Sequence, residues 1–267
     1  INWATVDTQK TVYWLGKAEN IASKLKAPEL QSYVNLELGY FFQKKQNWTL
    51  ALKYADEAYS KSQAESTNDS NYRSLKLMGD LHLQMGKKEL ALKNYRDTIL
   101  AIDYLNKTIS STNAERTIKF NREIQPVYKN ALSIILEQPK TSLAELKEAL
   151  VISDKLRLSQ LKSYFGEDCF EVANNYSSPK KGVATINSIV LHDQVFFFFL
   201  LPDGEIIKSS RKIGQSKLTE SAKQWREELK TGFSWQFRDR SKFVYDLIVE
   251  PFELELESAN SDIKVLV

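Results

Sequence analysis

The chain of 267 residues is poor in the side chains that build cross-linked or reactive sites, since it has one cysteine and two histidines. A single cysteine, Cys169, excludes an internal disulfide and is typical of a protein in a reducing compartment. The two histidines and the cysteine lie far apart in the sequence and match no metal-ligand spacing. We therefore expect neither a metal nor a cofactor.

Long apolar runs and a strong charge of one sign are also missing. The longest apolar run, Val195 to Leu201, is far shorter than the ~20 residues that a membrane helix needs. The first ten residues have no unbroken apolar core of the kind found in a signal peptide. With 37 basic and 34 acidic residues, the net charge of +3 is too small for a nucleic-acid binder. We expect a cytoplasmic protein that binds neither membranes nor nucleic acids.

The length suffices for about two domains, and 42% hydrophobic with 27% charged residues is ordinary for a globular protein. Residues 1–137 have the periodicity of helices throughout, 138–176 form one connecting helix, and 177–267 mix strand-like and helical segments. The expected fold class is α + α/β, with antiparallel helical hairpins followed by a smaller α/β unit that contains a β-meander.

Two segments of the helical part align at an offset of 40 residues. In each, an apolar residue and a glycine are followed, twelve residues after the glycine, by Ala-Leu-Lys. The glycines are Gly39 and Gly79, and the turns between the helices fall at 46–47 and 86–87. Where two helices cross closely, only Gly or Ala lets the backbones approach, which explains small residues at fixed positions.

This pattern resembles the tetratricopeptide repeat, a helical hairpin that stacks into arrays with a concave groove. The resemblance implies that the groove recruits a protein or a peptide. The residues that face the groove in repeat register are Tyr33, Tyr40, Lys44, Arg73, Lys76 and Gln84. Aromatic side chains combined with cations suit a peptide that carries a carboxylate. The alternative is that these are ordinary exposed helix residues.

Further helices flank the repeats. A helix from about Thr8 to Lys26 carries one apolar face before Pro28 ends it. The residues of that face are Val12, Leu15, Ala18, Ala22 and Leu25. After the repeats, helices are expected at Ala114 to Phe120 and at Val127 to Leu136, and Ser142 with Glu145 has the spacing of a capping box that opens a helix ending at Gly166.

Beyond Tyr176 the pattern changes to strands. Three segments rich in Val, Ile and Phe, separated by turn residues, predict a meander over 183–192, 195–201 and 205–212. Phe196 to Phe199 are expected in a core, covered on both faces. Helices follow over 219–230 and from Phe243 to about Glu257 with a kink at Pro251, and Ile263 to Val267 is predicted to start a buried strand.

A second resemblance rests on several motifs taken in order. They are Glu123-Ile124-Gln125-Pro126-Val127-Tyr128, the helix that ends in Phe165-Gly166-Glu167-Asp168-Cys169, Leu201-Pro202-Asp203-Gly204, Gln224-Trp225-Arg226 and Tyr245-Asp246-Leu247-Ile248-Val249-Glu250-Pro251. From about Ile118 to Val267 the chain looks like the first part of a CHAT domain, the caspase-like domain that bacteria attach to tetratricopeptide arrays. The resemblance implies a cysteine peptidase that the repeats regulate.

No catalytic residue carries over, because the segments that hold the His/Cys dyad of that family do not occur in this sequence. The residues that could form a dyad of their own are His82, His192 and Cys169. We interpret them instead as a packing histidine, a surface turn histidine and a core thiol. This chain is therefore predicted to have no peptidase activity.

The sequence starts at Ile1 rather than Met and stops within the last expected strand, which predicts a piece of a longer protein whose open sheet would also allow self-association. The alternative is a complete, non-enzymatic repeat scaffold with a small accessory meander. Two short basic clusters, Lys208 to Lys212 and Arg238 to Lys242, are interpreted as solvated surface rather than as an anion site.

Overall fold

The computed structural model describes residues 8–63, 69–105, 119–165, 181–231, 235–258 and 263–267. They are mostly helical, with a small four-stranded mixed sheet. The chain divides into two compact units. The first unit extends to Ile134 and takes in the end of α8 (Leu143–Phe165) from Ser159 onward. The second consists of Ile135–Leu158 and of the described residues from 181 on.

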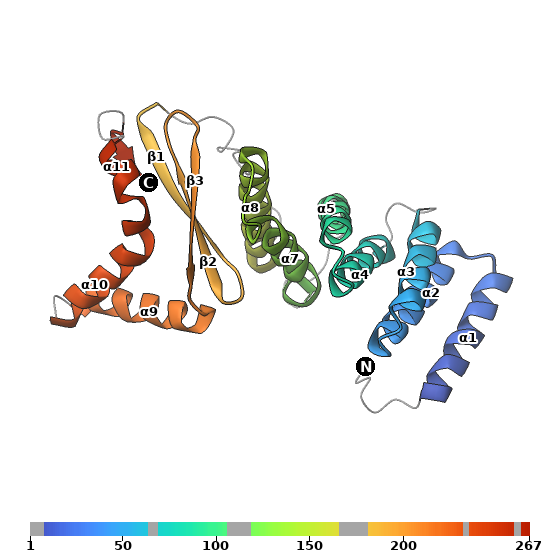
Figure 1. Ribbon diagram of the computed structural model, residues 1–267. Coiled ribbons are helices and arrows are strands. Elements are labelled where there is room, and N and C mark those ends of the chain that lie inside the picture. The colour runs from blue at the N-terminus through green and yellow to red at the C-terminus, as the bar shows by residue number, and fades with distance from the viewer. Residues whose placement is uncertain (1–7, 64–68, 106–118, 166–180, 232–234, 259–262) are drawn as a thin grey trace. The chain divides into compact units, whose positions relative to one another are not determined.

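The first unit is built on two helical hairpins (Figure 1). Its helices are α1 (Thr8–Lys24), α2 (Pro28–Lys44), α3 (Trp48–Ser62), α4 (Ser70–Gln84) and α5 (Lys88–Leu105). Helix α2 pairs with α3, α4 pairs with α5, and α3 packs against α4. The apolar core between α2, α3 and α4 consists of Leu36, Ala51, Ala55, Ala58, Leu75, Leu77, Met78 and Leu81.

The 40-residue offset of the sequence is an offset of the structure as well. The turn of the first hairpin has Gln46 at φ +56°, and the turn of the second has Gly86 at φ +74°. In the first turn the amide of Asn47 donates to the carbonyl of Phe42 at 3.0 Å, and in the second that of Lys87 donates to His82 at 2.8 Å. Both turns thus end the first helix of a hairpin with the same hydrogen bond.

Close helix contact explains the glycine in each hairpin. A Cβ atom built at Gly39 would lie 2.8 Å from Cδ2 of Leu77, with the backbone of Ala51 at 3.5 Å. At Gly79 it would lie 2.7 Å from Cε1 of Tyr95. Gly39 therefore lies close to the backbone of its partner helix α3 and makes room for a side chain of α4 in the next hairpin. Gly79 makes room for a side chain of its own partner helix α5.

Two further elements precede α8 in this unit. A π-helical turn, η2 (Phe120–Ile124), leads directly into α7 (Gln125–Leu136). Phe120 and Ile124 of this turn are buried, and the turn is tied to α4 by side-chain bonds described below. The expected helix over 114–120 lies mostly outside the described residues.

Helix α1 only partly follows its prediction. Leu15 and Ala18 are half-buried and Ala22 is buried, as expected. Val12 and Leu25, placed on the same face by the sequence, are instead exposed. The buried stripe of α1 is narrower than predicted because, among the described elements, α2 alone packs closely on this helix, so the positions at the margins of the apolar face stay in solvent.

The second unit holds the predicted meander. Strands β1 (Val183–Val190), β2 (Gln194–Leu200) and β3 (Ile206–Lys212) pair antiparallel in sequence order, and β4 (Val265–Leu266) joins β1 in parallel. The strand order is therefore β3-β2-β1-β4. Helices α9 (Gln215–Thr231) and α10 (Trp235–Ile248), the short 3₁₀ turn η4 (Glu250–Phe252) and α11 (Glu253–Ser258) follow β3.

Both faces of the sheet are covered, as expected for a strand with four consecutive phenylalanines. All four side chains of Phe196 to Phe199 are buried. Phe197 and Phe199 belong to a core shared with Leu247 and Phe252 of the helical segment that follows α9, and the rings of Phe199 and Phe252 lie 5.3 Å apart. Phe196 and Phe198 point to the other face, along which Figure 1 shows α8.

Lys208 ties the sheet to the end of α7. Its ammonium group donates to the carbonyls of Leu136 (3.0 Å) and Gln138 (3.4 Å) and to the hydroxyl of Thr141 (2.7 Å). A lysine at carbonyls that have no helical partner stabilises a helix C-terminus. The interpretation of Lys208 as part of a solvated basic cluster is therefore wrong.

At the start of α8, the amide of Glu145 donates to Ser142 Oγ at 3.3 Å, which confirms the capping box.

Two other expectations about this unit are corrected. The strand at 263–267 exists as β4, but it is not buried, since 51% of Val265, 44% of Leu266 and 69% of Val267 are exposed. The last helical segment begins at Trp235 rather than Phe243, and it is interrupted by η4 instead of kinked. Pro251 lies within this 3₁₀ turn because it has no amide hydrogen with which to continue an α-helix.

A substitution at Gly79 tests the close contact on which the hairpins rest. We expect Gly79→Ala to destabilise the protein, because overpacking costs about 1–3 kcal/mol and Tyr95 cannot move away: its hydroxyl donates to Asp80 at 2.8 Å and accepts from Asn130 at 3.1 Å. Gly16→Ala is the matched control, since nothing lies within 4 Å of its Cβ position; it should stabilise by roughly 0.5–1 kcal/mol. Urea unfolding followed by circular dichroism measures both. Equal responses of the two variants would contradict the close contact.

Candidate functional site

A pocket of about 310 Å³ opens on the first helices of the two hairpins. Its walls come from three elements, α2, α4 and the π-turn η2. The lining residues are Glu37, Tyr40, Lys44, Arg73, Lys76, Arg122 and Glu123. Side chains three, four or seven residues apart lie on one face of a helix, which is how α2 supplies its share at 37, 40 and 44 and α4 its share at 73 and 76.

The base of the pocket is an ion network centred on Arg73. The guanidinium lies 3.2 Å from Asp69 and 3.3 Å from Glu123, so it joins α4 to η2. Glu123 also accepts a hydrogen bond from Tyr72 at 2.8 Å and pairs with Arg122 at 2.8 Å. Burial alone would raise the pKa of Glu123, but the hydrogen bonds from Arg122 and Tyr72 and the charge of Arg73 lower it. Glu123 is therefore held as an anion that neutralises the cations around it.

Lys76, on the wall that α4 forms, is anchored in the same way. Its ammonium group lies 2.5 Å from Asp80, and Asp80 accepts a hydrogen bond from Tyr95. Tyr95 in turn accepts from Asn130 of α7 at 3.1 Å. A chain of polar contacts thus fixes Lys76 relative to α5 and α7, and it leaves little of its charge unbalanced.

The remaining charges of the pocket are less well matched. Lys44 is exposed and forms no ion pair within the described part of the chain. The side chain of Arg122 is 74% exposed, and its contact with Glu123 occupies only one edge of the guanidinium. These two cations therefore remain accessible to a ligand. The ring of Tyr40 lines the same pocket, and burial raises the pKa of its phenol.

Glu37 is half-buried in the wall without a hydrogen-bonding partner among the described residues. Burial raises the pKa of its carboxyl above the ordinary 4.5, an effect that the charge of Arg73 reduces in part. A carboxylate in this position costs folding free energy when it is ionised. Such a cost is common in surfaces that are shaped for a ligand rather than for stability.

The groove residues expected from the sequence are brought together to a large extent. Tyr40, Lys44, Arg73 and Lys76 line the pocket. The sequence-predicted Tyr33 lies outside the lining, where its hydroxyl donates to Asp69 at 2.5 Å and so supports the carboxylate that holds Arg73. Gln84, the sixth predicted residue, is exposed at the end of α4 and does not line the pocket.

Three lining residues were missed by the sequence. Glu37 was accessible to prediction, because it lies three residues before Tyr40 on the same helical face. Arg122 and Glu123 belong to a π-turn, for which the sequence carries no signal. The contribution of η2 to the pocket is therefore a finding of the structure.

The candidates for a catalytic pair lie in ordinary surroundings where the structure describes them. His82 shares a 2.8 Å hydrogen bond with the side-chain oxygen of Asn94, which links the two helices of the second hairpin. His192 is exposed in the turn between β1 and β2. Cys169 lies outside the described residues. No group of His, Cys, Asp and Glu side chains in the described ranges is arranged to hold a metal ion.

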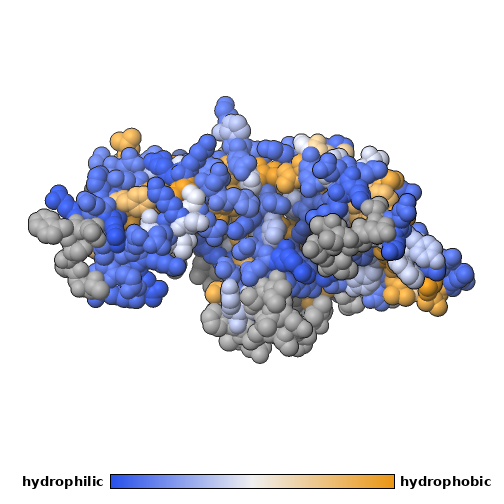
Figure 2. Space-filling view, turned by 90° about the horizontal axis from the view of Figure 1, so that it is seen from below, coloured by the Kyte–Doolittle hydropathy of each residue, from blue (hydrophilic) through white to orange (hydrophobic). Residues whose placement is uncertain are grey.

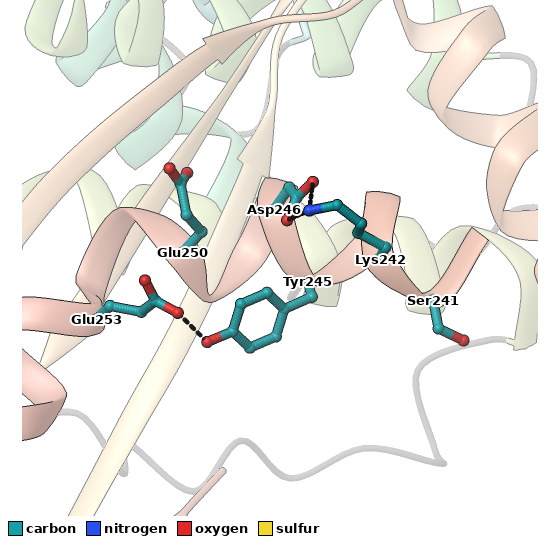
Figure 3. Close-up of a pocket in the computed structure, with 6 residues that line it drawn as sticks. All are labelled: Ser241, Lys242, Tyr245, Asp246, Glu250 and Glu253. Atoms are coloured by element: carbon teal, nitrogen blue, oxygen red, sulfur yellow. Dashed lines mark hydrogen bonds and ion pairs between the residues drawn. The ribbon is translucent and has the colours of Figure 1, made fainter. Parts of the chain in front are cut away.

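A second pocket, of about 690 Å³, lies in the other unit on α10, η4 and α11 (Figure 3). Its lining residues are Ser241, Lys242, Tyr245, Asp246, Glu250 and Glu253. Lys242 pairs with Asp246 at 3.1 Å, Tyr245 donates to Glu253, and Glu250 pairs at 2.9 Å with Arg211 of β3. Because its one cation, Lys242, is already paired with Asp246 and its other carboxylates have partners on an open surface, this pocket is a weaker candidate for a binding site than the first one.

Comparison with family models, with curated proteins and with solved structures finds no match to this chain. Across the helices that the structure describes, none combines the length and the apolar character needed to cross a membrane. The functional argument therefore rests on the pocket itself.

The raised pKa of Glu37 gives a test of the pocket electrostatics. Since the folded protein disfavours the ionised carboxyl, Glu37 costs stability at a pH above both its folded and its unfolded pKa. We expect Glu37→Gln to raise Tm at pH 7 and the gain to vanish as the pH falls below about 4, where both states bind the proton. Differential scanning fluorimetry across pH 3.5–7.5 measures this.

Glu57→Gln is the control for that experiment, because Glu57 is an exposed carboxylate of α3 that faces Lys53 at 3.7 Å. It should show no gain in Tm at any pH. A gain of the same size in both variants would mean that the effect comes from the overall charge of the protein and not from the burial of Glu37.

Proposed function

We propose that this chain is a protein-interaction module, in which the pocket on the helical hairpins recruits an acidic segment of a protein or peptide partner. The observation that supports it most is the pocket, which gathers Tyr40, Lys44, Arg73 and Lys76 from two successive hairpins. The 40-residue repeat of turns and glycines is consistent with tetratricopeptide-like hairpins. In such arrays the face formed by the first helices is a common site for peptides.

The distribution of charge indicates where a ligand would be recognised. Arg73 and Lys76 already face Asp69, Glu123 and Asp80, so an incoming carboxylate gains little from them. Lys44 and Arg122 are the accessible cations at the rim. We expect a carboxylate to bind between these two, while an apolar part of the peptide packs on the ring of Tyr40.

The proposal extends to the second unit through the resemblance to CHAT domains. In this reading the sheet and its covering helices are part of a caspase-like cysteine peptidase domain, and partner binding by the hairpins regulates it. The parallel pairing of β4 with β1 and the helices on both faces of the sheet are compatible with a larger α/β domain. A non-enzymatic scaffold with an accessory meander is the alternative, and it shares the same pocket.

We further propose that the chain by itself has no peptidase activity. His82 is engaged with Asn94 in the packing of a hairpin, and His192 is exposed in a strand turn. Incubation of the chain with an unfolded protein such as reduced casein should give no cleavage. Cleavage that disappears in Cys169→Ala would contradict this part of the proposal and leave the binding function to be judged separately.

The binding function is tested with a displayed library of 12-residue peptides that includes free C-termini. We expect selected peptides to be enriched in Asp and Glu and to bind more weakly at high salt. Lys44→Glu/Arg122→Glu should weaken binding by about 10-fold or more in fluorescence anisotropy, because two attractions become repulsions at a rim.

Lys53→Glu/Lys93→Glu is the matched control, since it makes the same change of charge at equivalent exposed positions on α3 and α5. It should leave the affinity within about 2-fold, as expected for charges away from a binding site. Selected peptides without acidic residues, or an equal loss in the two double variants, would contradict recognition at this pocket.

A further inference from the structure

Helix α1 and the turn residue Leu25 expose an apolar stripe beside the face that packs on α2. Trp14 is 62% exposed, Ile21 57% and Leu25 63%, although each is large and apolar. Figure 2 shows hydrophobic residues gathered at the end of the first unit that carries α1, on a surface that is otherwise mostly hydrophilic. An exposed apolar patch of this kind, bordered by charged residues, is characteristic of a surface that binds a partner.

The spacing of the stripe is that of a helix-pairing seam. Together with half-buried Ala18, the three residues occupy positions i, i+4, i+7 and i+11, which are successive d, a, d and a positions of a heptad. Leu25 is the first residue after α1, and its amide still donates to the carbonyl of Ile21 at 3.0 Å, as in a helix. The seam covers twelve residues, or about 18 Å at 1.5 Å per residue. On one side of it the helix is packed on α2 through Leu15 and Ala22.

On the other side of the seam lies a row of lysines. Lys10, Lys17 and Lys24 are spaced by seven residues and take the three g positions next to the seam. All three are exposed, and the ammonium group of Lys17 lies 4.5 Å from the ring centre of Tyr13 and 5.1 Å from that of Trp14. Glu19 is the one acidic residue of α1, and it lies away from this row.

We propose that this seam binds an amphipathic helix of a partner protein whose apolar stripe is flanked by Asp and Glu. In paired helices the residues at e and g decide which partner is accepted, and a row of lysines selects acidic residues opposite. A second copy of α1 is disfavoured, because an antiparallel pair through this seam would place lysines against lysines. A lipid surface is also less well matched, since the lysines flank one side of the stripe and α2 occupies the other.

This surface is distinct from the pocket, which lies on α2, α4 and η2. The chain would then hold two partners, or two segments of one partner, at different places on the first unit. An acidic segment would bind in the pocket, and an acidic amphipathic helix would bind at the end of the array.

The experiment uses the full chain and two designed peptides of three heptads with Leu and Ile at a and d. One peptide has Glu at every e and g position, and the other has Lys there. We expect the acidic peptide to bind at least about 10-fold more tightly than the basic one in fluorescence anisotropy. A photoreactive group at a seam position of the acidic peptide should cross-link to residues of α1.

Two variants separate the contributions of the seam and of the lysine row. Trp14→Ser/Ile21→Ser should abolish binding of the acidic peptide, and Lys17→Glu/Lys24→Glu should reverse the preference toward the basic peptide. All four positions are exposed, so the fold should persist, which circular dichroism checks. Lys44→Glu/Arg122→Glu should leave binding of the acidic peptide to the seam unchanged. The proposal for the pocket and the proposal for the seam can therefore be contradicted independently.

Several outcomes would overturn the proposal. They are equal binding of the two peptides, binding that survives the loss of Trp14 and Ile21, and cross-links outside α1. A dimer in sedimentation analysis that is lost in Trp14→Ser/Ile21→Ser would assign the seam to a second copy. Seam-dependent flotation with phosphatidylserine vesicles, without peptide binding, would assign it to a membrane surface.

Discussion

The approach of the helices at Gly39 and Gly79 is the constraint on which the first unit depends. A Cβ atom at either position would lie less than 3 Å from a side chain that makes further contacts in the protein interior. Leu77 belongs to the apolar cluster between the hairpins, and Tyr95 carries hydrogen bonds to Asp80 and Asn130. Because the glycines allow the helices to pack this closely, they fix the positions of α2 and α4. The pocket opens on the outer faces of these two helices.

Polar contacts then fix the walls of the pocket to one another. Tyr33, Tyr72 and Tyr95 each donate a hydrogen bond to a carboxylate that also pairs with a cation of the lining. Burial and these carboxylates raise the pKa of all three phenols, so the tyrosines remain neutral donors at any ordinary pH. A set of neutral donors and internal ion pairs keeps the buried charges in place without making the base of the pocket strongly positive.

Much of this organisation could be predicted from the sequence, and the exceptions have physical reasons. The repeat, the meander and the buried phenylalanines follow from periodicity, turn residues and the small residues at helix contacts, which are local signals. The part that η2 plays could not be foreseen, because a π-turn differs from an α-helix by one hydrogen-bond step and needs no special residue. The role of Lys208 depends on a contact with residues about 70 positions earlier, which no local pattern records.

The candidate site was predictable to a similar degree. Repeat register identified Tyr40, Lys44, Arg73 and Lys76, since residues on one helical face stay together when hairpins stack. The repeat register could not show which of these cations are accessible to a ligand. Arg73 and Lys76 are committed to Asp69, Glu123 and Asp80, and some of these partners lie on other turns or elements. Whether a cation is free to bind a ligand depends on its ion pairs in the folded structure. The sequence pattern of a single helix does not record these ion pairs.

The exposed stripe of α1 follows from the same principle of stacking. A helix inside an array has neighbours on two sides, whereas α1 is covered by α2 alone among the described elements that contact it closely. A stacked array is stable in water when its outermost face is polar. The exposed stripe beside the α2-facing side of α1 has lysines at one margin and Trp14, Ile21 and Leu25 along its centre. Exposed apolar residues at heptad spacing do not help to keep the protein in solution. A second helix that packs on them would explain their spacing.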